Sequence, residues 1–225
     1  MSLLGKAAVA IWQDAPPEAR AEYFEWHSRE HMPERVGIPG FLRGRRYCAL
    51  KGQPEFFTLY EAESLDVLTG PDYTGRLNNP TPWTRRVAPQ LKNNVRSLCN
   101  VVLSLGSGAG GLVMTWRYDV AHGREAEHRS VAEERLRALA ARPGVVGAHL
   151  CIADTAASSV QTAEKRARPT KALTPGWVLI VEGAREREAL ESACAELLPP
   201  ATLEQAGALE LGAGVYQLQF MPTTT

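Results

Sequence analysis

The side chains best suited to chemistry are concentrated in one short stretch near the start of the chain. Read at helical spacing, most of them fall on one face, with a second histidine beside it; the group is Tyr23, Trp26, His27, Glu30 and His31. A carboxylate next to an imidazole can orient the ring and set its pKa near neutrality, which suits general acid–base catalysis. We therefore predict that His31, His27 and Glu30 form a catalytic group, with Glu30 as the orienting carboxylate.

Two other interpretations of these histidines are open. Partly exposed helix residues with satisfied ring nitrogens would leave the same pattern. The run from His27 to His31 also reads H-x-x-E-H, the inverted zinc-protease signature, in which two histidines four residues apart bind one zinc ion. Because the motif ends at Pro33 and no third ligand is evident, we predict no metal at this site.

Further candidates to contact a ligand come from later segments. In the expected second strand, alternation separates Arg46 from its arginine neighbours, and its guanidinium could hold a carboxylate or a developing oxyanion. Trp83 lies in a long proline-rich segment of the kind that forms lids, although such a residue also suits a small satellite core. The predicted ligand-binding residues are Tyr23, Trp26, Arg46, Tyr60 and Trp83.

The chain contains two copies of one pattern. Trp12 and Trp116 mark matching positions, and a Pro-Gly pair follows each tryptophan at the same distance, at 39–40 and 143–144. At this offset the second copy has valine and arginine where the first copy has its two histidines. We therefore predict a single functional site per chain, in the first copy.

Each copy reads strand–helix–strand–strand–helix–strand, the ferredoxin-like order. In the first copy the expected strands are 7–12, 41–50, 56–62 and 95–105, and the expected helices are 17–32 and 64–68. In the second copy the strands are 112–116, 145–153, 177–183 and 209–220, and the helices are 124–141 and 185–197. The predicted domains are residues 1–105 and 112–225, and residues 106–111 form a glycine-rich linker. The second copy also has a longer loop, 154–176. It contains Lys165, Arg166, Arg168 and Lys171 and few apolar residues, so we expect it to be mobile and solvated.

A ferredoxin-like unit leaves one face of its sheet bare and partly apolar. We predict an α+β fold in which two tandem ferredoxin-like repeats cover these faces by packing sheet to sheet, as an intramolecular version of a dimeric α/β barrel; two independent domains are the alternative. The linker also matches G-x-G-x-x-G, but a strand is expected after it. A dinucleotide site needs a helix there, so we interpret the segment as a flexible linker.

The amino-acid composition limits the classes of partner that the protein is expected to bind. Lys+Arg and Asp+Glu are both 25, so no basic excess is available for nucleic acid. No apolar run is long enough to cross a bilayer, and the N-terminus lacks the features of a signal peptide. The four cysteines form no C-x-x-C pair and suit buried thiols in a reducing compartment. We expect a cytoplasmic protein that binds a small molecule, as a monomeric pseudo-dimer or a homodimer.

The stretch from Trp26 to Arg35, with Ile38-Pro39-Gly40-Phe41 and Arg45-Arg46-Tyr47, resembles the EthD-like branch of the dimeric α/β-barrel superfamily. This resemblance implies the barrel fold and suggests His31, then His27, as the polar residue of the pocket. Relatives of this kind include cofactor-free monooxygenases, lactone isomerases, haem-degrading enzymes and polyketide cyclases. A haem ligand from one of the five histidines remains an alternative, but the expected cofactor is none.

Two functions from different classes follow. The first is a cofactor-free enzyme of monooxygenase, isomerase or dehydratase type, acting on a small aromatic, lactone or polyketide-like molecule. The second is a non-catalytic module that binds a small molecule or only fills a structural role.

Overall fold

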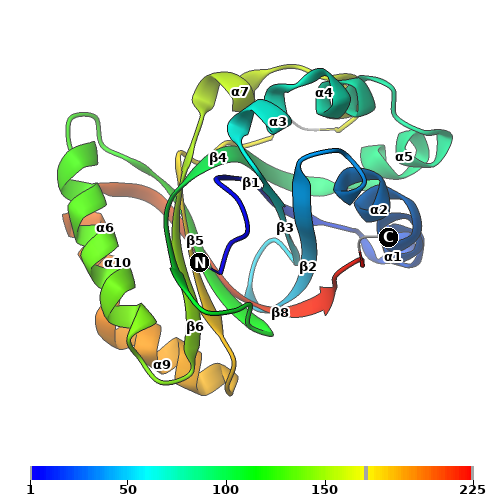
Figure 1. Ribbon diagram of the computed structural model, residues 1–225. Coiled ribbons are helices and arrows are strands. Elements are labelled where there is room, and N and C mark those ends of the chain that lie inside the picture. The colour runs from blue at the N-terminus through cyan, green and yellow to red at the C-terminus, as the bar shows by residue number, and fades with distance from the viewer. Residues whose placement is uncertain (1, 170–171, 224–225) are drawn as a thin grey trace.

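The strands of the chain close into one antiparallel barrel. The computed structural model describes residues 2–169 and 172–223. Around the barrel the strand order is β1-β3-β2-β8-β5-β7-β6-β4 (Figure 1). One half, β4-β1-β3-β2, comes from the first repeat, and the other half, β8-β5-β7-β6, comes from the second. Each half has the strand order of a ferredoxin-like sheet, so the predicted fold class is confirmed.

The first repeat places its helices on one side of the barrel. Its elements are β1 (Ala7–Asp14), η1 (Pro17–Ala19), α1 (Arg20–Trp26), η2 (His27–His31), α2 (Met32–Val36), β2 (Phe41–Gly52), β3 (Phe56–Ala62), α3 (Leu65–Thr69), α4 (Pro71–Asn78), α5 (Pro82–Val87), η3 (Ala88–Gln90) and β4 (Lys92–Gly106). The expected strands are all present. The expected single helix over 17–32 is instead a chain of short helical pieces, one of them a π-helix.

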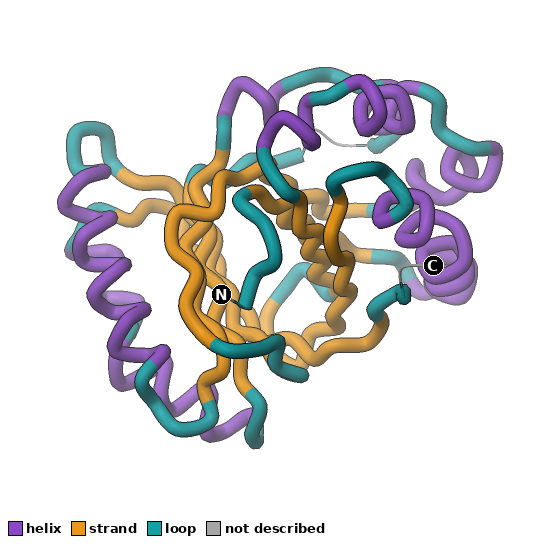
Figure 2. The backbone as a smooth tube through the Cα atoms, in the orientation of Figure 1, coloured by secondary structure: helices purple, strands orange, loops and turns teal. Residues whose placement is uncertain are grey.

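The second repeat covers the opposite side with longer helices, as Figure 2 shows. Its elements are β5 (Leu112–Val120), α6 (Glu125–Ala140), β6 (Val145–Ala153), α7 (Thr155–Ser159), α8 (Ala163–Arg166), β7 (Trp177–Gly183), α9 (Arg187–Leu197), α10 (Pro200–Gln205) and β8 (Ala208–Phe220). The long loop expected after β6 therefore contains two short helices, α7 and α8. They lie beside α3 and α4 of the first repeat (Figure 1).

The two repeats are joined along both edges and through the barrel interior. Strand β2 pairs with β8, and β4 pairs with β6, so neither sheet has a free edge. Inside, Trp12 stacks on Phe57, and the Trp12 indole N–H donates to the Thr115 hydroxyl across the two repeats at 3.3 Å. Val178 and Tyr216 of the second repeat belong to the same buried cluster. Residues of both copies thus share one core, as expected if each covers the other's bare sheet.

The barrel interior also contains charges. Arg45 makes two hydrogen bonds to the carboxylate of Glu182, at 2.8 and 3.1 Å, and both side chains are fully buried. The same carboxylate accepts from the backbone N–H of Gly110 at 2.8 Å. A side chain at Gly110 would collide with the backbone of Gly183, so only glycine fits there. The segment that we interpreted as a flexible linker is therefore fixed against the barrel, and a strand, β5, follows it.

No helix among residues 2–169 and 172–223 is long and apolar enough to span a membrane.

Candidate functional site

A π-turn shapes the helix that carries the two histidines. The Met32 N–H donates to the carbonyl of His27, five residues earlier, which defines the π-helix η2. Pro33 follows, and because it has no N–H it cannot support an α-helical bond at this point. A π-turn takes more residues per turn than an α-helix, so residues four apart lie close to one line. His27 and His31 consequently both face the sheet and are 2% and 5% exposed.

The same π-turn moves Glu30 away from the histidines. Its carboxylate accepts hydrogen bonds from the hydroxyls of Thr81 and Thr84, at 2.5 and 3.4 Å, at the start of α5. Within the described residues it has no hydrogen bond to either imidazole. The predicted role of Glu30 as the carboxylate that orients a histidine was therefore wrong. The error came from assuming 3.6 residues per turn, which places positions 27 and 30 on one face.

A small closed cavity lies between the histidines and the outer face of the first repeat's sheet. Its volume is about 20 Å³, and its wall includes His27, His31, Thr58 and Tyr60. Such a space holds roughly one water molecule and has no room for a substrate or a porphyrin in this conformation. Any organic ligand would therefore require part of the wall to move.

Three polar atoms on the wall of this cavity have no hydrogen-bond partner among the described residues. They are Nδ1 of His31, the hydroxyl of Tyr60 and the hydroxyl of Thr58, and all three are buried. Buried polar atoms are nearly always paired, because leaving one unpaired costs about 1–3 kcal/mol. The three residues line one cavity, so their unpaired atoms make it the candidate site for a polar ligand.

The electrostatics of the site keep its histidines neutral. Burial lowers the pKa of His31 well below its usual value, and the positive charges of Arg35 and Arg168 lower it further. Burial also lowers the pKa of His27, with His31 and Arg46 adding to the effect. Burial raises the pKa of Tyr60 well above its usual value, so its phenol stays protonated. At neutral pH the site therefore combines a neutral His31 imidazole, whose Nδ1 is unpaired within the described residues, with a phenol able to donate a hydrogen bond.

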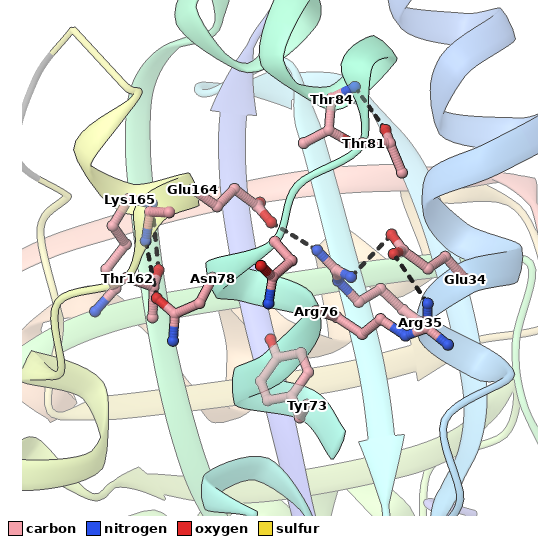
Figure 3. A network of polar contacts seen from close by, with 12 residues as sticks. Glu34, Arg35, Tyr73, Arg76, Asn78, Thr81, Thr84, Thr162, Glu164 and Lys165 are labelled. Carbon is pink, nitrogen blue, oxygen red and sulfur yellow. Dashed lines mark hydrogen bonds and ion pairs between the residues drawn. The ribbon is translucent and has the colours of Figure 1, made fainter. Parts of the chain in front are cut away.

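Buried charges surround the cavity, as Figure 3 shows in part. Arg35 on α2 donates to Glu164 at 2.6 Å and to Glu34 at 3.0 Å. Arg96 on β4 donates to the hydroxyl of Tyr73 at 2.9 Å. These residues were not among our sequence candidates, because they are scattered over separate elements and only the fold brings them together. A charged residue near the start of a strand that becomes apolar, such as Arg96 between Val95 and Ser97, was the available signal.

Part of the site comes from the second repeat. Glu164 and Arg168 belong to the long loop after β6, which we expected to be solvated and mobile. Their side chains are only 8% and 9% exposed, and Arg168 donates to Gln13 at 3.1 Å. That expectation was therefore wrong for these two residues, since the loop finds buried partners in the other repeat. Lys171, which was part of the same expectation, lies outside the described residues.

Of the predicted ligand-binding residues, some line the cavity, some contact its histidines and one lies away from it. Tyr60 lines the cavity. Tyr23 stacks on His27 with ring centroids 5.1 Å apart, and Trp26 lies 4.3 Å from the ring of His31. Trp83 does not line the cavity; its indole N–H donates to Glu22 at 3.2 Å on the outer side of the helix.

Arg46 contacts the site only through His27. Its guanidinium lies 3.2 Å from His27 Nδ1 and donates to Gln219 at 2.9 Å, so it supports a histidine and does not line the cavity.

Within its described residues the second repeat has no equivalent site, because both of its buried histidines have their ring nitrogens engaged. His128 contacts the Tyr118 hydroxyl at 2.8 Å and the Ala206 carbonyl at 3.2 Å. His149 lies 3.0 Å from each of the hydroxyls of Ser2 and Ser104. Within the part of the chain that the structure describes, no group of three or more His, Cys, Asp or Glu side chains is placed to hold a metal ion. The zinc interpretation of H-x-x-E-H thus lacks a ligand set there, since Glu30 also points elsewhere.

The fold has clear relatives among solved structures. A protein described as anthrone oxidase-like matches with a TM-score of 0.63 and 13% identity, over 99% of this chain and 95% of that one. A proposed monooxygenase from Fusobacterium nucleatum matches with a TM-score of 0.60 and 9% identity, over 97% and 95% of the two chains. Another, from Lactobacillus acidophilus, gives 0.57 and 11%, over 97% and 96%.

This fold is that of the dimeric α/β barrels. No family model and no curated protein sequence matches the chain. At such low identities the structural likeness establishes the fold of the barrel and leaves its chemistry to the residues of the site.

Proposed function

We propose that this dimeric α/β barrel is a cofactor-free enzyme that removes a proton from a small aromatic, lactone or polyketide-like molecule. The observation that carries the proposal is that His31 and Tyr60 line one cavity, while Nδ1 of His31 and the Tyr60 hydroxyl have no hydrogen-bond partner among the described residues. The resemblance to the EthD-like branch supports it, because that resemblance points to the same histidine. The names of the similar structures, anthrone oxidase-like protein and monooxygenase, belong to the same chemistry.

The proposed step is the removal of a C–H proton next to a carbonyl group. Nδ1 of His31 accepts the proton, and the C–H electron pair moves onto the carbonyl oxygen to give an enolate. The Tyr60 O–H and the positive charge of Arg35 and Arg96 stabilise this oxyanion. The enolate then either regains a proton on another carbon, which is isomerisation, or reacts with molecular oxygen.

The low pKa of His31 fits such a substrate. Burial lowers the pKa of His31 most, and the charges of Arg35 and Arg168 lower it further, so the ring removes a proton poorly until an anion forms beside it and offsets the arginine charges. The base is therefore best matched to carbon acids that give a stabilised, phenolate-like enolate.

Oxidation of anthrone tests the proposal directly. Anthrone and O₂ give anthraquinone and water, so oxygen uptake and the absorbance of the quinone report the reaction without an added cofactor. We expect turnover by the wild-type chain and a loss of about 100-fold or more in His31→Gln, the usual effect of removing a general base. His122→Gln is the control, because His122 is fully exposed on the second repeat. Equal rates for wild type and His31→Gln would remove His31 from the mechanism.

The closed cavity favours a second candidate. A space of about 20 Å³ is also what a non-catalytic module with a filled interior would have. In that case His31→Gln would lower the free energy of unfolding, and neither anthrone nor any of its products would bind to the wild-type chain.

A further inference from the structure

The segment that closes the candidate site comes from the second repeat. Residues 155–168, which we name the capping segment, include α7 and α8, and α8 packs against α4. The Ala163 N–H donates to the side chain of Asn78 at 3.1 Å. The buried residues of the capping segment are all polar: Ser158, Thr162 and Glu164. A segment that buries so little apolar surface is held closed mainly by its polar contacts, so a ligand that replaces those contacts can offset the cost of opening it.

Glu164 is the residue that the capping segment inserts into the site. Its carboxylate lies 2.6 Å from the Arg35 guanidinium and 3.5 Å from that of Arg168, and the residue is 6% exposed. Burial raises the pKa of Glu164, but Arg35 and Arg168 outweigh burial and hold it below its usual value. Glu164 is therefore an ionised carboxylate held inside the site by arginines.

Two buried arginines belong to the body of the first repeat and stay when the capping segment leaves. Arg35 is 2% exposed and keeps only its neighbour Glu34 as a counter-ion. Arg96 is 9% exposed, lines the same cavity and has no ion pair within the described residues. A buried arginine deprived of its carboxylate is costly, so the open site has a strong preference for a replacement anion.

We propose that the site binds an aromatic or polyketide-like ligand with one carboxylate, which takes the place of Glu164 beside Arg35 and Arg96 when the capping segment opens. Glu164 is then an internal competitor of the ligand. The proposal rests on the proposed function, since it places the carbon skeleton of the ligand against His31 and Tyr60. It goes further by naming the charged group that the substrate class carries.

Glu164→Gln tests the proposal because it removes the charge and keeps the shape. Glu34→Gln is the matched control. The Glu34 carboxylate lies 3.0 Å from the same Arg35 guanidinium, but Glu34 is on α2 and does not move with the capping segment. The probes are 2-naphthoate and the neutral 2-naphthamide, measured by calorimetry. We expect wild type to prefer 2-naphthoate, and Glu164→Gln to bind it roughly tenfold more tightly, while Glu34→Gln changes the affinity about twofold or less.

Hydrogen exchange on the wild-type chain gives a second readout that needs no variant. Adding 2-naphthoate should increase amide exchange in residues 155–168 and leave the exchange of α6 unchanged. Weaker or unchanged binding of 2-naphthoate in Glu164→Gln, an equal gain in Glu34→Gln, or no preference over 2-naphthamide would each overturn the proposal. So would the absence of binding to all three proteins.

The two proposals fail in different ways. Neither naphthalene probe has a C–H proton that His31 could remove, so its binding does not depend on the proton-transfer step. If 2-naphthoate binds as expected while His31→Gln still oxidises anthrone at the wild-type rate, only the function of His31 is wrong. If anthrone turnover requires His31 but Glu164→Gln binds no better, only the role of Glu164 is wrong.

Discussion

The Arg46 guanidinium donates a hydrogen bond to Nδ1 of His27, with the two nitrogen atoms 3.2 Å apart. Arginine has only donors, so Nδ1 of His27 is the acceptor and its proton must be on Nε2. His27 is thereby a neutral ring with a defined tautomer, whereas Nδ1 of His31 has no partner within the described residues. Two histidines on one π-turn thus have different roles, one held by an arginine and one available to a ligand.

Arg46→Met should remove the hydrogen bond that fixes the tautomer of His27. Burial is the largest cause of the low pKa of His27, and Arg46 is a smaller one, so the pKa should rise and still stay below its usual value. The ring should also populate both neutral tautomers. Long-range ¹H–¹⁵N spectra of the imidazoles measure both effects. Arg29→Met is the control, since Arg29 lies on the same π-turn with a side chain 73% exposed. An unchanged His27 spectrum in Arg46→Met would contradict the assignment.

Stability should fall in mild acid because of the two buried histidines. The pKa values of His27 and His31 are lowered in the folded chain, so the unfolded chain binds more protons below about pH 6.5. Their contribution to stability is therefore complete above pH 6.5 and is lost as the pH falls below it. In that range each neutral imidazole lowers the free energy of unfolding by up to about 1.4 kcal/mol for each pH unit of acidification.

Urea unfolding at a series of pH values between 7 and 5 measures this slope. We expect His31→Gln to remove roughly half of the contribution from the pair, while His122→Gln leaves the slope unchanged because that side chain is fully exposed. A slope that is the same in all three proteins would mean that the histidines are not buried as described.

Glu30→Ala should affect stability more than catalysis. The Glu30 carboxylate accepts from Thr81 and Thr84 at the start of α5, so its loss should lower the free energy of unfolding by about 1–2 kcal/mol. Anthrone oxidation should remain within about twofold of wild type, in contrast to the loss expected for His31→Gln. A Glu30→Ala protein that folds normally but loses activity as His31→Gln does would restore Glu30 as a catalytic residue.

Breaking the charge pair inside the barrel should be costly. Burial raises the pKa of Glu182, but its contact with His149 and the charge of Arg45 outweigh burial and lower it to about 2. Glu182→Gln leaves Arg45 without its main counter-ion and should lower the free energy of unfolding by about 3–5 kcal/mol. Arg20→Gln, which breaks the exposed pair with Glu55, should cost about 1 kcal/mol or less.

Chemical denaturation compares these variants, and the combination Arg45→Met with Glu182→Leu should recover only part of the loss, because the buried Gly110 N–H then has no acceptor. Equal costs for the buried and the exposed pair would show that the interior charges are solvated.

The sequence alone was sufficient for the fold, because the fold depends on local patterns that repeat. Alternating apolar runs, the Pro-Gly pairs at 39–40 and 143–144, and the shared offset of Trp12 and Trp116 each act over short distances. They indicated two ferredoxin-like units, and the need to cover two bare sheet faces then indicated the barrel. The same local information selected His27, His31 and Tyr60 as candidates, and these residues lie on elements that were predicted with the correct type.

Only the tertiary structure decided which side chains meet at the site. The π-turn before Pro33 set the directions of His31 and Glu30, and a helical wheel has no place for an extra residue in one turn. Arg96 reaches the cavity from strand β4 of the first repeat, and Glu164 reaches it from helix α8 of the second, at a separation that no sequence spacing encodes. The reason is physical: periodicity reports which face of an element is buried, whereas contacts between distant elements depend on how those faces pack together.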